Sequence, residues 1–256
     1  MLSALPRGPR AMPRFLRVTP LRLSAAVLAA GLFAVSLIPS HAGTPAPMHA
    51  SGAPVVVELY HSQGCSSCPP AEADLNAIAG HDDVIALSFA VTYWDRLGWK
   101  DTFAAPQFTD RQVAYARAGR GEVATPEFIL NGTEAVVGAD RRALHDGIAR
   151  AAMTAPAATI TADGVGVRIA PRGAQGPATV WLVRYDPRTI DVPVGAGENA
   201  GRTLAQRNVV RELVRLGEWH GQAAHLALPA AREPALVNAV LVQRGPGGPI
   251  VASAKL

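Results

Sequence analysis

The sequence predicts an α/β domain followed by a smaller β-rich domain built as an antiparallel sheet or sandwich. The chain has 256 residues, of which 49% are hydrophobic and 17% are charged, so it can bury a core. Over residues 55–153, apolar β-branched runs alternate with stretches of helical periodicity, which is typical of α/β folds. From residue 158 to 256, glycine and proline separate short alternating runs, which is typical of antiparallel sheets.

Residues 1–42 are predicted to form a secretory signal peptide. Five arginines come first, an apolar run follows over residues 23–38, and a small-residue stretch places the predicted cleavage after Ala42. The apolar run is shorter than the about 20 residues of a membrane span; an uncleaved N-terminal anchor is the alternative. We therefore expect a periplasmic or secreted protein, with a linker at residues 43–54 and no stable membrane insertion after cleavage.

The distribution of charge argues against a nucleic-acid partner. The formal net charge is +4, but the predicted signal peptide holds five of the 24 basic residues and none of the 20 acidic ones. The rest of the chain is close to neutral and has no electrostatic reason to hold phosphates.

Both cysteines of the chain lie in one motif, Cys65-Ser66-Ser67-Cys68, so only one internal disulfide can form. A disulfide that closes so short a loop restrains the unfolded chain by only roughly 2 kcal/mol, against more than about 4 kcal/mol for a hundred-residue loop. The motif therefore favours a dithiol that exchanges electrons over a structural cross-link.

The residues around the motif place it between a strand and a helix. A β-branched run at residues 55–60 precedes it, and Pro69-Pro70 and a helical stretch at residues 71–79 follow it. At the N-terminus of a helix, the helix dipole and unpaired N–H groups lower the pKa of a thiol. We therefore predict that Cys65 is the exposed attacking thiol and that Cys68 is the resolving thiol.

A strand followed by Cys-x-x-Cys at a helix start resembles the thioredoxin fold, and the next hundred residues continue the resemblance. In thioredoxin-like proteins, a proline that opens the hairpin strand is cis and lies against the cysteines. Pro126, after Thr125, matches this proline in order and position, so we expect it to be cis, with an ordinary trans proline as the alternative. The other expected elements are a strand at residues 84–91, a helix at 107–118, a hairpin of strands 125–130 and 135–137, and a helix from Asp140.

Two ionisable side chains near the motif are candidates for supporting roles. Glu58 lies near the place of the buried acid that relays a proton to the resolving thiol in thioredoxins, although its offset from Cys65 is one residue longer. We interpret Glu58 as a candidate proton relay, with a strand-edge carboxylate as the alternative. His61 is a candidate for stabilising the thiolate, or an ordinary loop histidine. Because Ser-Ser replaces the Gly-Pro of thioredoxins between the cysteines, the direction of electron flow stays open.

An aromatic segment at residues 93–103 follows the second predicted strand, so by fold analogy it emerges at the same end of the sheet as the cysteines. We consider Tyr93, Trp94 and Trp99, together with Thr125, as a binding platform or lid for a partner. A long loop held by its own aromatic side chains is the alternative.

In the β-rich domain, we expect short strands and one helix at residues 209–216. The domain has no cysteine and no cluster of metal-ligand residues. For the loop at residues 198–208, a turn held by side-chain hydrogen bonds is the favoured interpretation, and a contact with the first domain or a partner is the alternative. The expected strands cover residues 159–169, 178–185, 190–194, 223–228 and 236–242.

Three segments together resemble a family of exported bacterial proteins with a thioredoxin-like fold, catalogued as domain of unknown function 1223. They are residues 57–70 with the cysteine motif, residues 93–101 with Tyr93-Trp94-Asp95, and the Gly-Glu-Asn segment at residues 197–203. The resemblance covers nearly all of the predicted mature chain. It implies a thioredoxin-like fold and a secreted location, and it implies no particular substrate.

These features favour an exported thiol–disulfide oxidoreductase that acts on protein or small-molecule thiols and disulfides and needs no cofactor. One alternative is a non-catalytic binding module with a structural or sensing disulfide. The other is a copper-handling protein. Structural zinc needs four ligands, which the chain does not offer near the motif, whereas copper(I) can be held by two thiolates. We predict no metal site.

Overall fold

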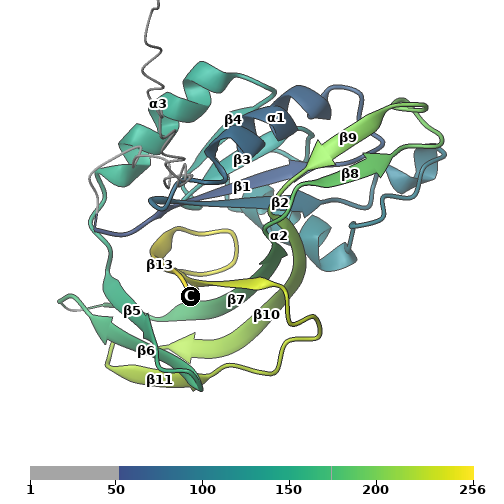
Figure 1. The fold of residues 1–256 in the computed structure, drawn as a ribbon. Helices are drawn as coiled ribbons and strands as arrows, with labels where there is room; N and C mark the ends of the chain where they lie inside the picture. Colours follow the sequence, from purple (N-terminus) through teal and green to yellow (C-terminus); the bar gives the residue numbers. More distant parts are fainter. Residues whose placement is uncertain (1–51, 174) are drawn as a thin grey trace, which may run out of the picture. The chain divides into compact units, whose positions relative to one another are not determined.

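The computed structural model describes residues 52–173 and 175–256, so the predicted signal peptide and most of the predicted linker lie outside the described residues. The described residues belong to one compact unit. They form a mixed eight-stranded sheet with the strand order β13-β12-β7-β10-β2-β1-β3-β4 and two smaller antiparallel sheets (Figure 1). Helices lie on both faces of the half of the large sheet that contains β1 to β4. None of the helices in the described part has the length and apolar character needed to cross a bilayer.

The first half of the described chain alternates strands and helices as predicted. Strands β1 and β2 pair in parallel, and β3 and β4 continue the sheet antiparallel to β1. Every residue of β1 and β2 is buried, which explains their nearly continuous apolar sequences. The elements are β1 (Val55–His61), α1 (Cys68–Ile78), β2 (Val84–Ala90), the 3-10 helix η1 (Asp95–Leu97), α2 (Pro106–Arg117), β3 (Glu127–Leu130), β4 (Glu134–Val137) and α3 (Arg141–Ala152).

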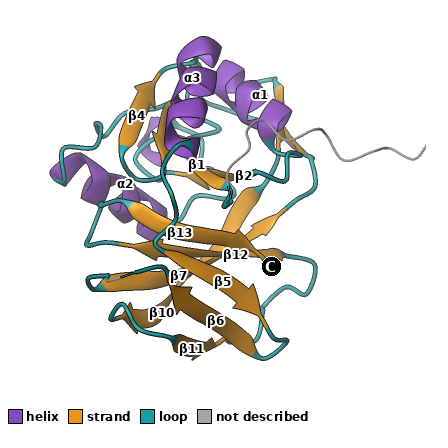
Figure 2. Cartoon of the chain, turned by 90° about the vertical axis from the view of Figure 1, so that its left-hand side faces the viewer, coloured by secondary structure: helices purple, strands orange, loops and turns teal. Residues whose placement is uncertain are grey.

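Alternate side chains of β1 face two different helix layers. Val57 and Leu59 pack with Leu75 of α1 and with α3, whereas Tyr60 packs with Tyr115 of α2 on the other face. Figure 2 shows α1 and α3 together on one side of β1 and β2, with α2 on the other side. Odd-numbered residues of β1 therefore face α1, where the cysteines are, and even-numbered residues face α2.

The second half of the chain is β-rich, as predicted, but the predicted helix at residues 209–216 is wrong. These residues belong to the long strand β10, which pairs with β7 over most of its length. The local pattern of apolar residues fits a helical period, but pairing with β7 satisfies the backbone and overrides this preference. The elements are β5 (Ala158–Ala162), β6 (Gly166–Pro171), β7 (Ala178–Asp186), β8 (Ile190–Pro193), β9 (Thr203–Gln206), β10 (Val209–Trp219), β11 (Ala224–Ala227), β12 (Val237–Gln243) and β13 (Ile250–Lys255).

One sheet spans the boundary that the sequence predicts between the two domains. Strand β10 pairs in parallel with β2 at Val209 and Ser88, and the Ser88 N–H donates to the Asn208 carbonyl at 3.0 Å. The β10 strand thereby covers an edge of β2 that would otherwise leave backbone groups unpaired. Strands β8 and β9 form a separate two-stranded hairpin beside α1, where Asn76 Nδ2 donates to the Ala205 carbonyl at 2.7 Å. We call residues 190–206 the β8–β9 hairpin.

Candidate active site around the Cys65–Cys68 disulfide

Cys65 and Cys68 form a disulfide between the end of β1 and the start of α1, with their Cα atoms 5.4 Å apart. A tight turn holds this segment. The Cys65 N–H donates to the Ser62 carbonyl at 3.1 Å, and the Cys68 N–H donates to the Cys65 carbonyl at 3.2 Å. The start of the helix thus positions the two sulfur atoms, as the sequence predicts.

Both cysteines are fully buried, so the prediction of an exposed Cys65 is wrong for the disulfide form. The Cys65 Sγ lies 3.8 Å from the Thr125 carbonyl oxygen and 3.3 Å from the Ser67 hydroxyl oxygen. Ser66 and Ser67 are the exposed residues of the motif. An attacking thiol reaches the sulfur atoms only if a neighbouring segment moves.

The N-terminus of α1 also offers fewer free N–H groups than the sequence argument assumes. The Cys68 N–H already donates to the Cys65 carbonyl, and Pro69 and Pro70 have no N–H group. The Ser66 N–H donates to Glu198 Oε2 at 3.1 Å. The helix start therefore provides less stabilisation for a Cys65 thiolate than a helix without these prolines would.

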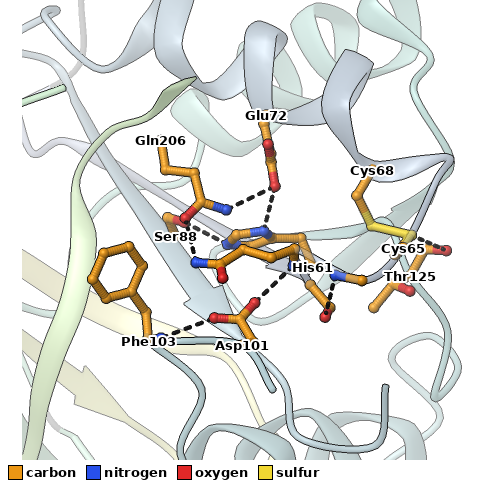
Figure 3. Close-up of polar contacts among 12 residues, drawn as sticks. His61, Cys65, Cys68, Glu72, Ser88, Asp101, Phe103, Thr125 and Gln206 are labelled. Atoms are coloured by element: carbon orange, nitrogen blue, oxygen red, sulfur yellow. Dashed lines mark hydrogen bonds and ion pairs between the residues drawn. A yellow bond between two sulfur atoms is a disulfide. The ribbon is translucent and has the colours of Figure 1, made fainter. Parts of the chain in front are cut away.

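The Thr125–Pro126 peptide bond is cis and lies beside the disulfide (Figure 3). Trp94 holds this segment from the other side, because its indole Nε1–H donates to Thr125 Oγ1 at 2.7 Å. Trp94 also lies beside the Gly64 backbone, immediately before Cys65. Thr125, Pro126 and Trp94 together form the wall of the site next to Cys65.

Gln63 connects the cysteine segment to the aromatic segment. Its Oε1 accepts from the Trp99 indole N–H at 3.0 Å and from the Thr102 N–H at 3.2 Å. Its backbone N–H donates to Asp101 Oδ2 at 2.7 Å. Trp94 and Trp99 are half-buried, and both indole N–H groups are bonded within the chain, which fits a loop held by its own aromatic side chains.

The β8–β9 hairpin reaches the same site from the second half of the chain. Asn199 is fully buried, and its Nδ2 donates to the carbonyls of Gln63 at 2.9 Å and Cys65 at 2.8 Å. Gly195 allows the hairpin to approach closely, because a Cβ there would lie 3.1 Å from the ring of Trp99. Contact with the first domain is only the alternative prediction for this loop, and neither Glu198 nor Asn199 is predicted from the sequence as a site residue. All three segments that carry the family resemblance thus meet around the disulfide.

A buried polar cluster lies between β1, β2 and α1 (Figure 3). His61 Nδ1 is 2.7 Å from Glu72 Oε1, and His61 Nε2 is 2.6 Å from Ser88 Oγ. Gln206 of β9 donates to Glu72 Oε1 at 3.0 Å and accepts from Gln63 Nε2 at 3.1 Å. Because Glu72 follows Cys68 by four residues, the two side chains share a face of α1.

Burial and neighbouring charges shift the pKa of His61 and of Asp101, which is bonded to the Gln63 backbone. Burial lowers the pKa of His61, but the hydrogen bond and charge of Glu72 and the charge of Asp101 outweigh it and raise the pKa. Burial raises the pKa of Asp101, against the charge of His61 and the N–H groups of Gln63 and Phe103. Both ring nitrogens of His61 are bonded to Glu72 and Ser88, so the ring has no donor left for the Cys65 sulfur.

Glu58 does not lie with the cysteines. Its side chain points to the α2 face of β1, where Arg111 Nη2 and Nε donate to Glu58 Oε1 at 2.6 and 3.1 Å and the Tyr60 hydroxyl donates to Oε2 at 3.0 Å. The sequence identified a buried acid on β1 but not the face that it occupies. Its assignment as proton relay to Cys68 is therefore corrected.

Tyr93 contacts both α2 and Thr125. Its hydroxyl donates to Gln112 Oε1 of α2 at 3.3 Å, and burial raises the pKa of Tyr93 to about 12, against its hydrogen bonds with Thr125 and Gln112. Of the four predicted platform residues, Trp94, Trp99 and Thr125 lie at the site, and Tyr93 reaches it through its hydrogen bond with Thr125. Among the described residues, no group of three or more His, Cys, Asp or Glu side chains is arranged to hold a metal ion.

Comparison with known proteins places these features in a family. The family described as "Protein of unknown function (DUF1223)" matches residues 56–243, a range that contains all three segments around the disulfide. A similar crystal structure is that of protein AGR_C_4864 from Agrobacterium tumefaciens. It is 34% identical with a TM-score of 0.66, and the match covers 81% of this chain and 96% of that one. None of the curated proteins matches the chain.

Proposed function

The chain belongs to the DUF1223 family, and from that premise we propose that it is an exported thiol–disulfide oxidoreductase that uses the Cys65–Cys68 pair. Its partners are thiols and disulfides of proteins or small molecules in the periplasm or outside the cell. The observation that carries the proposal is the disulfide at the start of α1 with the cis Thr125–Pro126 bond beside it. Structural cross-links rarely join residues so close in sequence, because they restrain the unfolded chain little.

The arrangement of the first half supports a thioredoxin-like fold for this part of the chain. The order is strand, helix, strand, helix, antiparallel hairpin and helix, with the disulfide after the first strand. Strand β1 pairs in parallel with β2 and antiparallel with β3. The cis proline precedes β3, the strand next to β1, which brings the proline and the cysteines to the same end of the sheet.

The chemistry is a two-electron exchange with a partner disulfide. In the reduced protein, the Cys65 thiolate attacks one sulfur of the partner disulfide, forms a mixed disulfide and releases one partner thiolate. Cys68 then loses its proton and attacks the Cys65 Sγ, which releases the second partner thiolate and forms the Cys65–Cys68 disulfide. The partner gains two electrons and the protein loses two; a partner dithiol drives the same steps in reverse.

The buried pair of His61 and Glu72 is suited to take up the Cys68 proton. Glu72 shares a face of α1 with Cys68, and His61 holds the Glu72 carboxylate at 2.7 Å. We assign to this pair the role that the sequence suggested for Glu58. Histidine is the side chain whose unperturbed pKa lies closest to neutral pH, which suits proton exchange.

The proposal is tested by turnover of insulin disulfides with dithiothreitol and by reactivation of scrambled ribonuclease. We expect the wild-type protein to accelerate at least one of the two reactions, and Cys65→Ser to reduce the rate to background. Cys68→Ser is the matched variant: it should stop turnover but accumulate a mixed disulfide through Cys65, detectable by mass spectrometry. A wild-type rate equal to that of the double variant Cys65→Ser/Cys68→Ser would overturn the proposal.

A non-catalytic binding module is the second candidate function, because both cysteines are fully buried. In this case the disulfide would hold the loop in shape for a partner. The two candidates differ in one outcome: a structural disulfide resists reduction until the protein unfolds, whereas an exchanging disulfide is reduced in the folded protein.

A further inference from the structure

A carboxylate from the β8–β9 hairpin lies directly on the cysteine motif. Glu198 Oε2 accepts from the Ser66 N–H at 3.1 Å and from the Ser66 hydroxyl at 2.6 Å. The Ser66 hydroxyl and N–H lower the pKa of Glu198, so the carboxylate is charged at neutral pH. A negative charge therefore stands one residue from Cys65.

The position of this carboxylate is fixed by its buried neighbour. Asn199 donates to the carbonyls of Gln63 and Cys65, and Arg202 Nη1 donates to Asn199 Oδ1 at 2.7 Å. Glu198 itself is exposed, and it makes its contact from an anchored hairpin. The contact with Ser66 is thus part of the arrangement that covers the disulfide.

Few hydrogen-bond donors lie next to Cys65, and the Ser67 hydroxyl, 3.3 Å from the Cys65 Sγ, is one of them. The Cys68 N–H is bonded to the Cys65 carbonyl, and the next two residues of α1 are prolines. The N–H and hydroxyl of Ser66 are two donors next to Cys65, and Glu198 takes both. A thiolate at Cys65 needs such donors, because charged sulfur is stabilised by hydrogen bonds and by the positive end of a helix.

We propose that Glu198 is a positioning residue whose negative charge, held on the donors of Ser66, disfavours the Cys65 thiolate and so keeps the disulfide form favoured. The proposal rests on the proposed function and adds a residue that sets the redox balance of the same site. Reduction by a dithiol transfers two electrons to the disulfide. Cys68 then takes one proton, Cys65 remains a thiolate, the second proton goes to solvent, and the dithiol becomes a disulfide. The new negative charge appears beside Glu198.

Other charged groups near the disulfide stay constant in the test. His61 and Glu72 approach from β1 and α1, Asp101 approaches from the segment after β2, and Arg202 approaches from the β8–β9 hairpin. A variant that changes only Glu198 therefore isolates its contribution. Glu198→Gln keeps an acceptor for Ser66 and removes the charge. Asp191→Asn, at an exposed position in β8 of the same hairpin, is the matched control.

Two measurements on the full mature chain test the proposal. The first is the pH profile of Cys65 alkylation by iodoacetamide in the reduced protein, with the modified residue located by mass spectrometry. The second is the equilibrium between disulfide and dithiol in glutathione buffers at pH 7. We expect Glu198→Gln to lower the Cys65 pKa and to shift the equilibrium toward the dithiol by about two- to fivefold, the size of one charge at a helix N-terminus. Asp191→Asn should change neither, and 1 M salt should shrink the difference.

The outcomes separate this proposal from the proposed function. If Glu198→Gln leaves both the Cys65 pKa and the glutathione equilibrium at their wild-type values, the role of Glu198 is overturned while the exchange function stands. If the wild-type disulfide is not reduced by glutathione in the folded state, the proposed function itself fails. A Glu198→Ala variant that changes unfolding stability but not the Cys65 pKa would show that Glu198 only holds the hairpin in place.

Discussion

Two buried acid–base pairs lie on opposite faces of β1 and differ in what their basic partner can do. On the α2 face, Glu58 is bonded to Arg111, whose guanidinium stays protonated at any physiological pH. On the α1 face, His61 is bonded to Glu72, and a histidine, unlike an arginine, can lose its proton. Only the second pair has a member, Glu72, on the helix that begins with Cys68.

The surroundings of the two pairs also differ. Arg111 lies over the rings of Phe89, Tyr115 and Trp181, and its Nη1 donates to Gln243 Oε1 of β12 at 3.0 Å. This pair joins α2 to the β-rich half and is built into an aromatic core. The His61 pair is surrounded instead by hydroxyl and amide groups that continue through Gln206 and Gln63 to the cysteine segment. Buried charge alone therefore does not identify a functional group; the chemistry of its partner and the face of the strand do.

The largest expected effect is on stability, from the Arg111 pair. Arg111→Met leaves the Glu58 carboxylate buried without its ionic partner, so we expect the free energy of unfolding to fall by about 3–5 kcal/mol. Urea denaturation measures this loss. The double variant Arg111→Met/Glu58→Leu should recover much of it, because no unpaired charge remains. A loss below about 1 kcal/mol in the single variant would show that Glu58 is not held by Arg111.

The second largest expected effect is a difference between the two pairs in how their contribution to the free energy of unfolding depends on pH. The folded-state pKa of His61 is raised, so its bond with Glu72 contributes fully below the unfolded pKa of about 6.5 and is lost as pH rises through the folded pKa. We expect Glu72→Gln to lower the free energy of unfolding by about 1–3 kcal/mol at pH 5.5 and by less at pH 9.

Glu58→Gln is the matched comparison for this prediction. Because Arg111 keeps its charge from pH 5.5 to pH 9, the loss caused by Glu58→Gln should not decline in the same way. Urea titrations of both variants and the wild type at the two pH values measure the difference. Equal pH dependence in the two variants would remove the chemical distinction between the pairs.

The smallest effect concerns the wall of the site. Trp94→Phe removes the indole N–H that donates to Thr125 Oγ1. We therefore expect the free energy of unfolding to fall by about 1 kcal/mol and dithiothreitol to reduce the disulfide faster. Trp99→Phe is the control. It removes a similar bond to Gln63, whose Oε1 still accepts from the Thr102 N–H, so the disulfide should be reduced at nearly the wild-type rate. Equal rates in both variants would show that Trp94 does not limit access to Cys65.

Local sequence patterns predicted much of the first half of the fold. Apolar runs located β1 and β2, Asn131-Gly132 located the β3–β4 hairpin, and the cysteine spacing located the start of α1. These features depend on neighbouring residues, so a single sequence carries them. The assignment of residues 209–216 was wrong because the partner strand β7, which turns this segment into a strand, is not visible in the local pattern.

The errors in the site have the same origin. Cys65 is covered by Thr125, Trp94 and the β8–β9 hairpin, whose Asn199 lies 134 positions away in the sequence. Glu58 was identified by its place relative to the buried acid of thioredoxins, and Glu72 was not identified. Both faces of β1 are buried, so the alternation of side chains did not show which face α1 covers. The spacing of residues within a motif can be read from the sequence. Which distant segments cover the motif is visible only in the tertiary structure.

The central claim, that the Cys65–Cys68 pair exchanges electrons in the folded protein, is tested most directly by titrating the disulfide with glutathione. Thiol content is followed by alkylation and mass spectrometry, and the fold by circular dichroism in the same samples. We expect a reversible two-electron transition while the fold persists. Its potential should lie above about −300 mV, the value below which structural disulfides resist reduction by glutathione. Thiols that appear only when the protein unfolds would contradict it.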